Sequence, residues 1–306
     1  MQARFLAFLA ALSTAAAQPD RPKVLGLAHM ALYTADVEKS RGFYKDLLGY
    51  SEPFRIDNPD GSLALTFIKI NDFQYVELFP EREKGSDRLS HIAIYTDDAE
   101  RMRQYLGSRG VKVPQRVPQG RSGNSNFSIR DPDGHSLEFV QYEPDGWAMR
   151  EKGKQMGPQR VSSRMLHVGI LVGNLAEATK FYSGLLGFQE TWRGSSNGTE
   201  LSWVNMRVPD GTDYIEFMLY KDMPAPTRRG SAHHICLEVP DMSKAVAHLE
   251  ARPARNEYGR KLEIRVGRNR KRQCNLFDPD GTRVELMEPD TIDGQPTPPS
   301  TAPPPR

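Results

Sequence analysis

Apolar positions cluster and alternate along the chain in a pattern that predicts short strands interrupted by helices, and this pattern repeats. Residues 24–50 (VLGLAHMALYTADVEKSRGFYKDLLGY) and 164–188 (RMLHVGILVGNLAEATKFYSGLLGF) each begin with an apolar, strand-like run that contains a histidine. A polar cap follows, and then a helix that ends in Leu-Leu-Gly plus an aromatic residue. Gly49 and Gly187 occupy the position at which glycine commonly ends a helix.

A second pair of similar segments completes the repeat. Residues 89–110 resemble residues 232–252, and each segment leads to a shared ending, RDPDGHSLEFVQ (130–141) or FDPDGTRVELME (277–288). Proline fixes φ and glycine supplies a positive φ, so each Asp-Pro-Asp-Gly predicts a tight turn. The apolar alternation on both sides of the turn predicts a hairpin.

The repeat divides the chain into four units, each predicted as one strand, a helix and three more strands: residues 24–80, 89–142, 164–220 and 232–288. A chain of 306 residues also suggests two domains, since one domain takes about 150 residues. We therefore expect an α+β fold of four βαβββ units, paired into domains at residues 24–145 and 164–289 with a linker at 146–163.

The two ends of the chain differ from the repeats. Arg4, the apolar run Phe5–Leu12 and the small residues Ala15–Ala17 have the layout of a secretory signal peptide, residues 1–17. The alternative is an amphipathic or buried N-terminal helix, but the polar segment QPDRPK follows at once. Residues 294–306 (GQPTPPSTAPPPR) are rich in proline and predict a disordered tail.

Composition excludes several function classes. The chain is 38% hydrophobic and 26% charged, which fits a globular protein. No apolar run approaches the about 20 residues that a membrane span needs. A net charge of +2 and a pI near 8.4 give no electrostatic footprint for nucleic acid. Two cysteines exclude a disulfide framework and a multi-cysteine zinc site.

Each unit carries one histidine on its first predicted strand and one glutamate on its last, 47 to 51 residues later. The four pairs are His29 and Glu77, His91 and Glu138, His167 and Glu216, and His234 and Glu285. A single strand histidine is more often a core residue than a ligand, and a glutamate often ends an edge strand. Here each glutamate lies between apolar neighbours, where a carboxylate is costly unless it is solvated, paired or bound to a metal. The fourfold recurrence favours metal binding.

Two units side by side would offer two imidazoles and two carboxylates to one ion. Such mixed nitrogen and oxygen sites suit Zn, Ni, Mn, Co or Fe(II). We therefore expect up to two divalent metal ions per chain. An open position on such an ion can hold substrate oxygens, polarise a carbonyl and stabilise an enolate.

These features resemble the vicinal oxygen chelate (VOC) superfamily, which includes glyoxalase I, methylmalonyl-CoA epimerase, type I extradiol dioxygenases and the bleomycin- and fosfomycin-resistance proteins. The resemblance covers residues 24–289 and rests on the repeated units, the paired His and Glu, the Leu-Leu-Gly helices and the Asp-Pro-Asp-Gly endings. It implies one curved sheet per domain around a metal site, and a small-molecule substrate. Units pair within or between chains in this superfamily, so a homodimer is compatible with it.

Among the activities of this superfamily, a glyoxalase-like lyase or isomerase fits best, because it uses two histidines and two glutamates. A carboxylate beside the metal then removes a proton alpha to a carbonyl, and Glu138 and Glu285 are the candidates, with Glu77 and Glu216 as alternatives. A ring-cleaving extradiol dioxygenase with Fe(II) is the second hypothesis. It would need an acid-base histidine and a tyrosine, and no histidine falls on the middle strands of the third unit, residues 195–206. A non-catalytic binding or resistance protein is the third, but bleomycin binders lack the metal ligands.

Several further residues have open interpretations. The basic run Arg265, Arg268, Arg270, Lys271 and Arg272 is either a solvated face or a pocket rim that would favour an anionic substrate. Cys236 is two residues from His234 and either lines the pocket or fills the core. His135 is expected in an exposed turn, His248 on a helix surface, and His233 on the opposite strand face from His234.

The signal segment makes a direct prediction. The mature protein should begin near Gln18 and be periplasmic or secreted, because a signal peptidase cleaves after small residues. N-terminal sequencing of protein from its native host checks this expectation. Recovery of the chain with Met1–Ala17 still attached would contradict it.

Overall fold

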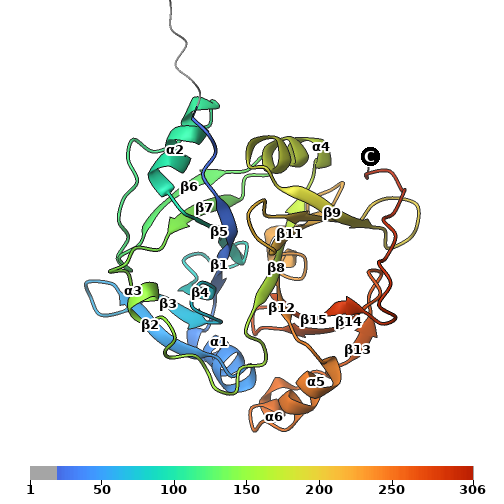
Figure 1. Ribbon diagram of the computed structural model, residues 1–306. Helices are drawn as coiled ribbons and strands as arrows, with labels where there is room; N and C mark the ends of the chain where they lie inside the picture. Colours follow the sequence, from blue (N-terminus) through green and yellow to red (C-terminus); the bar gives the residue numbers. More distant parts are fainter. Residues whose placement is uncertain (1–18, 306) are drawn as a thin grey trace, which may run out of the picture.

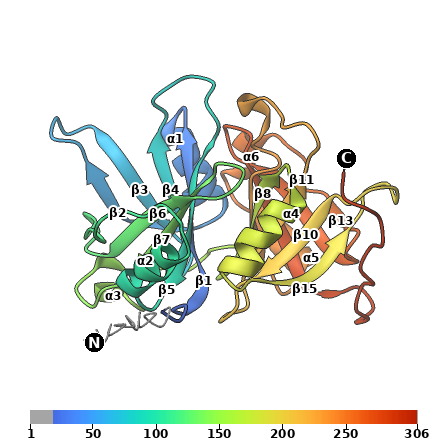
Figure 2. The ribbon, with the colours of Figure 1, turned by 90° about the horizontal axis from the view of Figure 1, so that it is seen from above.

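The computed structural model describes residues 19–305, and the predicted signal peptide lies outside the described residues. Two curved mixed sheets stand side by side, the first formed by residues 24–141 and the second by residues 165–291 (Figure 1). The view from above shows the same two bodies, with β1 and β8 near the boundary between them (Figure 2). The predicted α+β class is confirmed. Among the described residues, no helix is long and apolar enough to cross a membrane.

The first sheet contains seven strands in the order β2-β3-β4-β1-β5-β7-β6. Their bounds are β1 (Val24–Thr34), β2 (Ser51–Asp57), β3 (Leu63–Lys69), β4 (Tyr75–Pro80), β5 (Leu89–Thr96), β6 (Ser125–Arg130) and β7 (Ser136–Gln141). The second sheet contains eight strands in the order β13-β14-β15-β12-β8-β11-β10-β9. Their bounds are β8 (Met165–Val172), β9 (Gln189–Gly194), β10 (Trp203–Arg207), β11 (Tyr214–Leu219), β12 (His234–Glu238), β13 (Ile264–Val266), β14 (Lys271–Phe277) and β15 (Arg283–Thr291).

Each unit places a helix after its first strand. The α-helices are α1 (Val37–Arg41), α2 (Ala99–Ser108), α3 (Trp147–Arg150), α4 (Leu175–Thr179), α5 (Met242–Glu250) and α6 (Arg255–Tyr258). Helices α1 and α4 continue directly into π-helical turns, η1 (Gly42–Leu47) and η2 (Lys180–Leu185), and a short 3₁₀ turn, η3, covers Pro226–Arg228. The predicted helix-ending glycines, Gly49 and Gly187, both have a φ of +80°.

The first strands of two consecutive units pair antiparallel at the centre of each sheet, β1 with β5 and β8 with β12. The last strand of each unit then pairs in parallel with the first strand of the same unit, as β4 does with β1. Units one and two therefore share one sheet, and units three and four share the other. Side chains alternate along each strand, so Met30 and Ile92 enter the core while their neighbours His29 and His91 face the other way.

The second unit departs from the predicted pattern. After α2 it has two strands, β6 and β7, where three were predicted. The segment of residues 111–119 (VKVPQRVPQ) instead forms one isolated bridge, between Gln119 and Ser125. Pro114 and Pro118 fall in this segment, and a proline has no N–H to donate to a sheet ladder.

The predicted linker and tail are both ordered against the domains. Residues 147–150 form α3, and Lys69, which is fully buried, donates to the carbonyl oxygens of Glu151 and Lys154 at 2.8 Å each. The tail at 294–305 forms no helix or strand, as its prolines lead one to expect. It is nevertheless held along the second sheet, because Ser300 N donates to Arg193 O and Leu201 N donates to Pro303 O.

The two domains are joined by reciprocal contacts between a helix of one and a tight turn of the other. Tyr182 of η2 donates its hydroxyl to Asp131 at 3.0 Å, and Tyr44 of η1 donates to Asp278 at 3.3 Å. Both aspartates begin an Asp-Pro-Asp-Gly turn. All four side chains are buried. Each hydroxyl and carboxylate therefore bonds to its partner in the other domain in place of water.

Removing one of these hydroxyls tests the interface. Tyr182→Phe should lower the free energy of unfolding by about 1–3 kcal/mol, because Asp131 loses a buried donor. The midpoint of urea unfolding should fall accordingly. The control is Tyr95→Phe, since Tyr95 packs within the first domain against Phe73 and Tyr142. Equal midpoints for Tyr182→Phe and the control would show that the contact adds no stability.

Candidate metal centres

Strand pairing places the eight predicted histidines and glutamates in short rows across the two sheets. Every row has three positions on neighbouring strands: a histidine at one end, a glutamate at the other and a small residue between them. The rows are Glu77, Ala31 and His91; Glu138, Ala93 and His29; Glu216, Gly169 and His234; and Glu285, Cys236 and His167. Two adjacent rows make one centre in each sheet.

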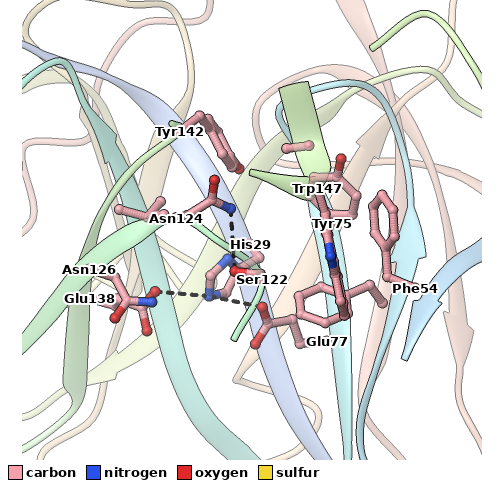
Figure 3. A pocket seen from close by; sticks show the side chains of 13 residues that line it. His29, Phe54, Tyr75, Glu77, Ser122, Asn124, Asn126, Glu138, Tyr142 and Trp147 are labelled. Carbon is pink, nitrogen blue, oxygen red and sulfur yellow. Dashed lines mark hydrogen bonds and ion pairs between the residues drawn. The ribbon is translucent and has the colours of Figure 1, made fainter. Parts of the chain in front are cut away.

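In the first centre the two histidines approach each other through their Nε2 atoms, which are 3.0 Å apart. A carboxylate oxygen of Glu77 lies 3.6 Å from His29 Nε2, and another lies 3.7 Å from His91 Nε2. The corresponding distances for Glu138 are 3.9 and 3.5 Å. Figure 3 shows His29 between Glu77 and Glu138, with all three side chains directed into one cavity.

The second centre repeats this geometry. The Nε2 atoms of His167 and His234 are again 3.0 Å apart. Oε2 of Glu216 lies 3.9 Å from His167 Nε2 and 3.3 Å from His234 Nε2, and Oε2 of Glu285 lies 3.5 and 3.6 Å from the same two nitrogens. The four predicted residues of each domain are therefore brought together, and the pairing is between units one and two and between units three and four.

These distances fit donors arranged around a single ion. Bonds of about 2.0–2.2 Å to an ion place neighbouring donors about 3–3.5 Å apart. In each centre, single ligand atoms of three of these residues lie within 4.8 Å of one another: His29, Glu77 and His91 in the first, and His167, His234 and Glu285 in the second. The fourth carboxylate is within 4 Å of both histidines. In the second centre His234 Nδ1 lies 2.8 Å from the carbonyl oxygen of Ala232, a contact that orients its Nε2 towards the donors.

Burial disfavours the charged forms of the side chains in the first centre. It raises the pKa of Glu138 to about 8 and that of Glu77 well above its usual value, where the charge of Glu138 adds to the effect. Burial also lowers the pKa of His91 to about 4 and that of His29 well below its usual value. A divalent cation between these groups would favour both charged carboxylates and neutral imidazoles.

The second centre has a different electrostatic environment. Burial on its own would raise the pKa of Glu285, but its hydrogen bond to His167 and the nearby charge of Arg283 hold that pKa below its usual value. Burial lowers the pKa of His234, and Arg283 lowers it further. Among residues 19–305, no arginine or lysine lines the cavity of the first centre.

The lining of the cavity over the first centre includes five aromatic residues that sequence reasoning missed. Its aromatic walls are formed by Phe54, Tyr75, Tyr142 and Trp147 (Figure 3) together with Phe67. Trp147 comes from the predicted linker and stacks on Phe54, with ring centroids 5.1 Å apart. The apolar flank Trp147-Ala148-Met149 was the only signal in the sequence that this segment packs on a domain.

The cavity over the second centre is lined by different residues. Trp192 and Trp203 form aromatic walls, and Arg265, Arg268 and Arg283 carry positive charge. The arginines of the basic run predicted on a hairpin therefore fall into two groups. Arg265 and Arg268 border the cavity, whereas Arg272 pairs with Glu288 at 3.2 Å and Arg270 pairs with Asp293.

The remaining histidines lie away from both centres. His248 is exposed on α5, as expected. His233 is buried and lies 3.5 Å from Asp87. The expectation that His135 is exposed is wrong: its side chain is largely buried, and its Nδ1 lies 2.8 Å from Asp131. Cys236 is buried in a small core cluster with Leu166, Met287 and Tyr214.

The model of the Glyoxalase/Bleomycin resistance protein/Dioxygenase superfamily matches residues 26–139 and again residues 164–286. The chain belongs to this superfamily. A lactoylglutathione lyase from Neisseria meningitidis is 30% identical over 123 residues, which are 38% of this chain and 89% of the relative. The two matches to the superfamily correspond to the two sheets, so each sheet is one superfamily domain.

Solved structures of the superfamily share the fold at low identity. The Mn(II)-bound glyoxalase from Novosphingobium aromaticivorans aligns with a TM-score of 0.66 at 17% identity, covering 87% of this chain and 83% of that one. The 2,3-dioxygenase LapB from Pseudomonas sp. KL28 aligns with a TM-score of 0.65 at 18% identity, covering 90% and 97%. The fold therefore accommodates both a glyoxalase and a dioxygenase.

The two centres predict a metal stoichiometry. The purified chain should bind close to two divalent ions, and His91→Ala or His234→Ala should each leave about one, because each histidine serves a single centre. His248→Ala, on the exposed face of α5, is the control and should still bind two. Elemental analysis after incubation with Zn, Ni, Mn or Fe(II) measures the content. Full uptake by both histidine variants would contradict the assignment.

The small residue inside each row makes a second prediction. A Cβ on Gly169 would lie 2.0 Å from ring atoms of His234, so Gly169→Ala must displace that ring. The affinity of the second centre for metal should fall by at least about tenfold, while the first centre keeps its ion. Gly184→Ala is the control, since its Cβ would meet nothing within 4 Å. Competition with a chelator measures both affinities.

Proposed function

We propose that the chain is a divalent-metal-dependent enzyme that transfers a proton alpha to a carbonyl, as a glyoxalase-like lyase or isomerase. Its substrate would be a small molecule with two adjacent oxygens. The observation that carries this proposal is the convergence of two histidines and two glutamates in each domain, with all four His–Glu distances at 3.3–3.9 Å. The similarity to a lactoylglutathione lyase supports the same reaction class.

In this proposal His29, Glu77, His91 and Glu138 hold one ion, and His167, Glu216, His234 and Glu285 hold the other. A bound divalent ion would polarise the substrate carbonyl and stabilise the enolate charge. The chain itself supplies the base, the orientation of the substrate and the exclusion of water. The aromatic walls over the first centre and the tryptophans over the second serve the last two roles.

Glu138 and Glu285 are the proposed bases. Each follows the glycine of an Asp-Pro-Asp-Gly turn by four residues, on β7 and β15, so the two carboxylates enter their centres from equivalent strands. Each also lines the cavity above its centre, where a substrate carbon would lie. A carboxylate there can take a proton from the substrate and return it to the neighbouring carbon.

Glu138→Gln and Glu285→Gln test the assignment. Glutamine keeps the volume and one oxygen but loses the basic carboxylate, so turnover in the altered centre should fall by about 10²–10⁴-fold. Metal content should stay close to two ions per chain. Exchange of solvent deuterium into 2-oxoaldehyde or epimerisable-acid substrates, followed by NMR, measures the proton-transfer step. Glu77→Gln and Glu216→Gln are the matched comparisons.

The double variant Glu138→Gln/Glu285→Gln gives the deciding result. If it retains full exchange, the base is Glu77 or Glu216, and the corresponding variants should then lose the activity. A chain that binds none of the metals would instead favour the non-catalytic binding role.

One observation favours an extradiol dioxygenase as the second candidate. The first cavity is walled by five aromatic side chains, including Tyr75 and Tyr142, and these suit a flat aromatic ring. Against it, neither described cavity is lined by a histidine other than His29, so the expected acid-base histidine has no counterpart. Oxygen uptake by the Fe(II)-loaded chain with catechol would reverse the order of the two candidates.

A further inference from the structure

The two centres share their ligands but differ in the charge and size of the cavity above them. The cavity over the first is about 40 Å³, and its charged side chains are the ligands Glu77 and Glu138. The cavity over the second is about 300 Å³, and it adds three arginines to Glu216 and Glu285. With a divalent ion bound to each, the first cavity would be close to neutral and the second strongly positive.

Two of these arginines have no carboxylate partner. Within residues 19–305, no Asp or Glu oxygen lies within 4.0 Å of the guanidinium of Arg268 or Arg283, whereas Arg265 pairs with Glu263 at 2.6 Å. Arg268 donates to the carbonyl oxygen of Ser196. Arg283 places Nη2 2.7 Å from His234 Nδ1, but that nitrogen donates to Ala232 when Nε2 faces a metal. Within the described residues Arg283 Nη2 then has no acceptor, and it can donate to a ligand.

Three residues that line the second cavity also have a buried polar atom without a partner. Within residues 19–305, Trp192 Nε1, Arg283 Nε and Asn275 Oδ1 make no hydrogen bond. No residue that lines the first cavity has such an atom. A buried donor or acceptor without a partner is destabilising, so such atoms commonly mark the place of a polar ligand or water.

We propose that the second centre selects substrates that carry an anionic group beside their two adjacent oxygens, and that Arg268 and Arg283 bind this group. The first centre, whose cavity has no arginine in its lining, gives such an anionic group no charged partner. This inference rests on the metal-dependent function proposed above. It assigns Arg268 and Arg283 to substrate selection and gives the two domains of one chain different substrate classes.

Two matched probes test the proposal on the full chain loaded with Zn(II). Catechol and 3,4-dihydroxybenzoate both offer adjacent oxygens, and only the second carries a carboxylate. The His91→Ala variant keeps only the second centre able to bind metal, and the His234→Ala variant keeps only the first. Calorimetry can therefore measure the binding of both probes at each centre separately. The ratio of the two affinities is compared between centres, which cancels the different intrinsic metal affinities of the probes.

The carboxylate should improve binding at the second centre by about ten- to a hundredfold more than at the first, as a charge-assisted contact does. Arg268→Met in the His91→Ala background should abolish most of this gain without changing metal content. Arg272→Met is the matched control, because Arg272 lies on the adjoining strand β14, pairs with Glu288 and does not line the cavity. Arg283→Met should act in the same direction as Arg268→Met.

The failures of the two proposals are distinguishable. A chain that takes up two ions but shows the same probe ratio at both centres, or a ratio that Arg268→Met leaves unchanged, would overturn this inference alone. A chain that takes up no metal would overturn the proposed function and this inference with it.

Discussion

The antiparallel pairing of the first strands of two units is the constraint on which both centres depend. Because β1 pairs with β5 and β8 with β12, each histidine is aligned with a small residue and, one strand further, with a glutamate from the other unit. A shift of one residue in the register of this strand pairing would place the histidines and glutamates in the core and the core residues in the cavity. The small residues Ala31, Ala93, Gly169 and Cys236 are part of the same constraint, since a larger side chain inside a row would crowd the histidine and the glutamate on either side of it.

The features that recur from unit to unit could be predicted from the sequence. The repeated spacing predicted the units, the α+β class and the helix-ending glycines. It also predicted the convergence of His29 with Glu77 and its partners, because strand periodicity fixes the face on which a residue lies. The small residues within the rows could have been found in the same way, since Ala31 and Gly169 each lie two residues after a histidine. Their importance depends on register, which single-strand patterns do not reveal.

What the sequence could not predict depends on contacts between distant segments. Trp147 lies in a stretch with linker-like composition, yet it packs on Phe54 and closes the first cavity. The tail is held by hydrogen bonds to Arg193 and Leu201, which a proline-rich composition does not suggest. On the hairpin of the basic run, some arginines pair with Glu263, Glu288 or Asp293 and others do not. Only the distances in the folded chain show which arginines are paired. The positions of the candidate metal ligands thus follow from local rules, whereas the walls of the cavities follow from tertiary packing.

The reciprocal contacts between domains bear on how a substrate reaches either centre. A hinge rotation that opened one side of the boundary would pull Tyr44 from Asp278 or Tyr182 from Asp131, and would also break the paired hydrogen bonds between Gln74 and the backbone of Met165. Domain closure is therefore a costly way to admit and enclose a ligand in this molecule. Entry and release of a ligand at either centre would then depend on segments at the rim of each sheet, so one centre could exchange its ligand without disturbing the other.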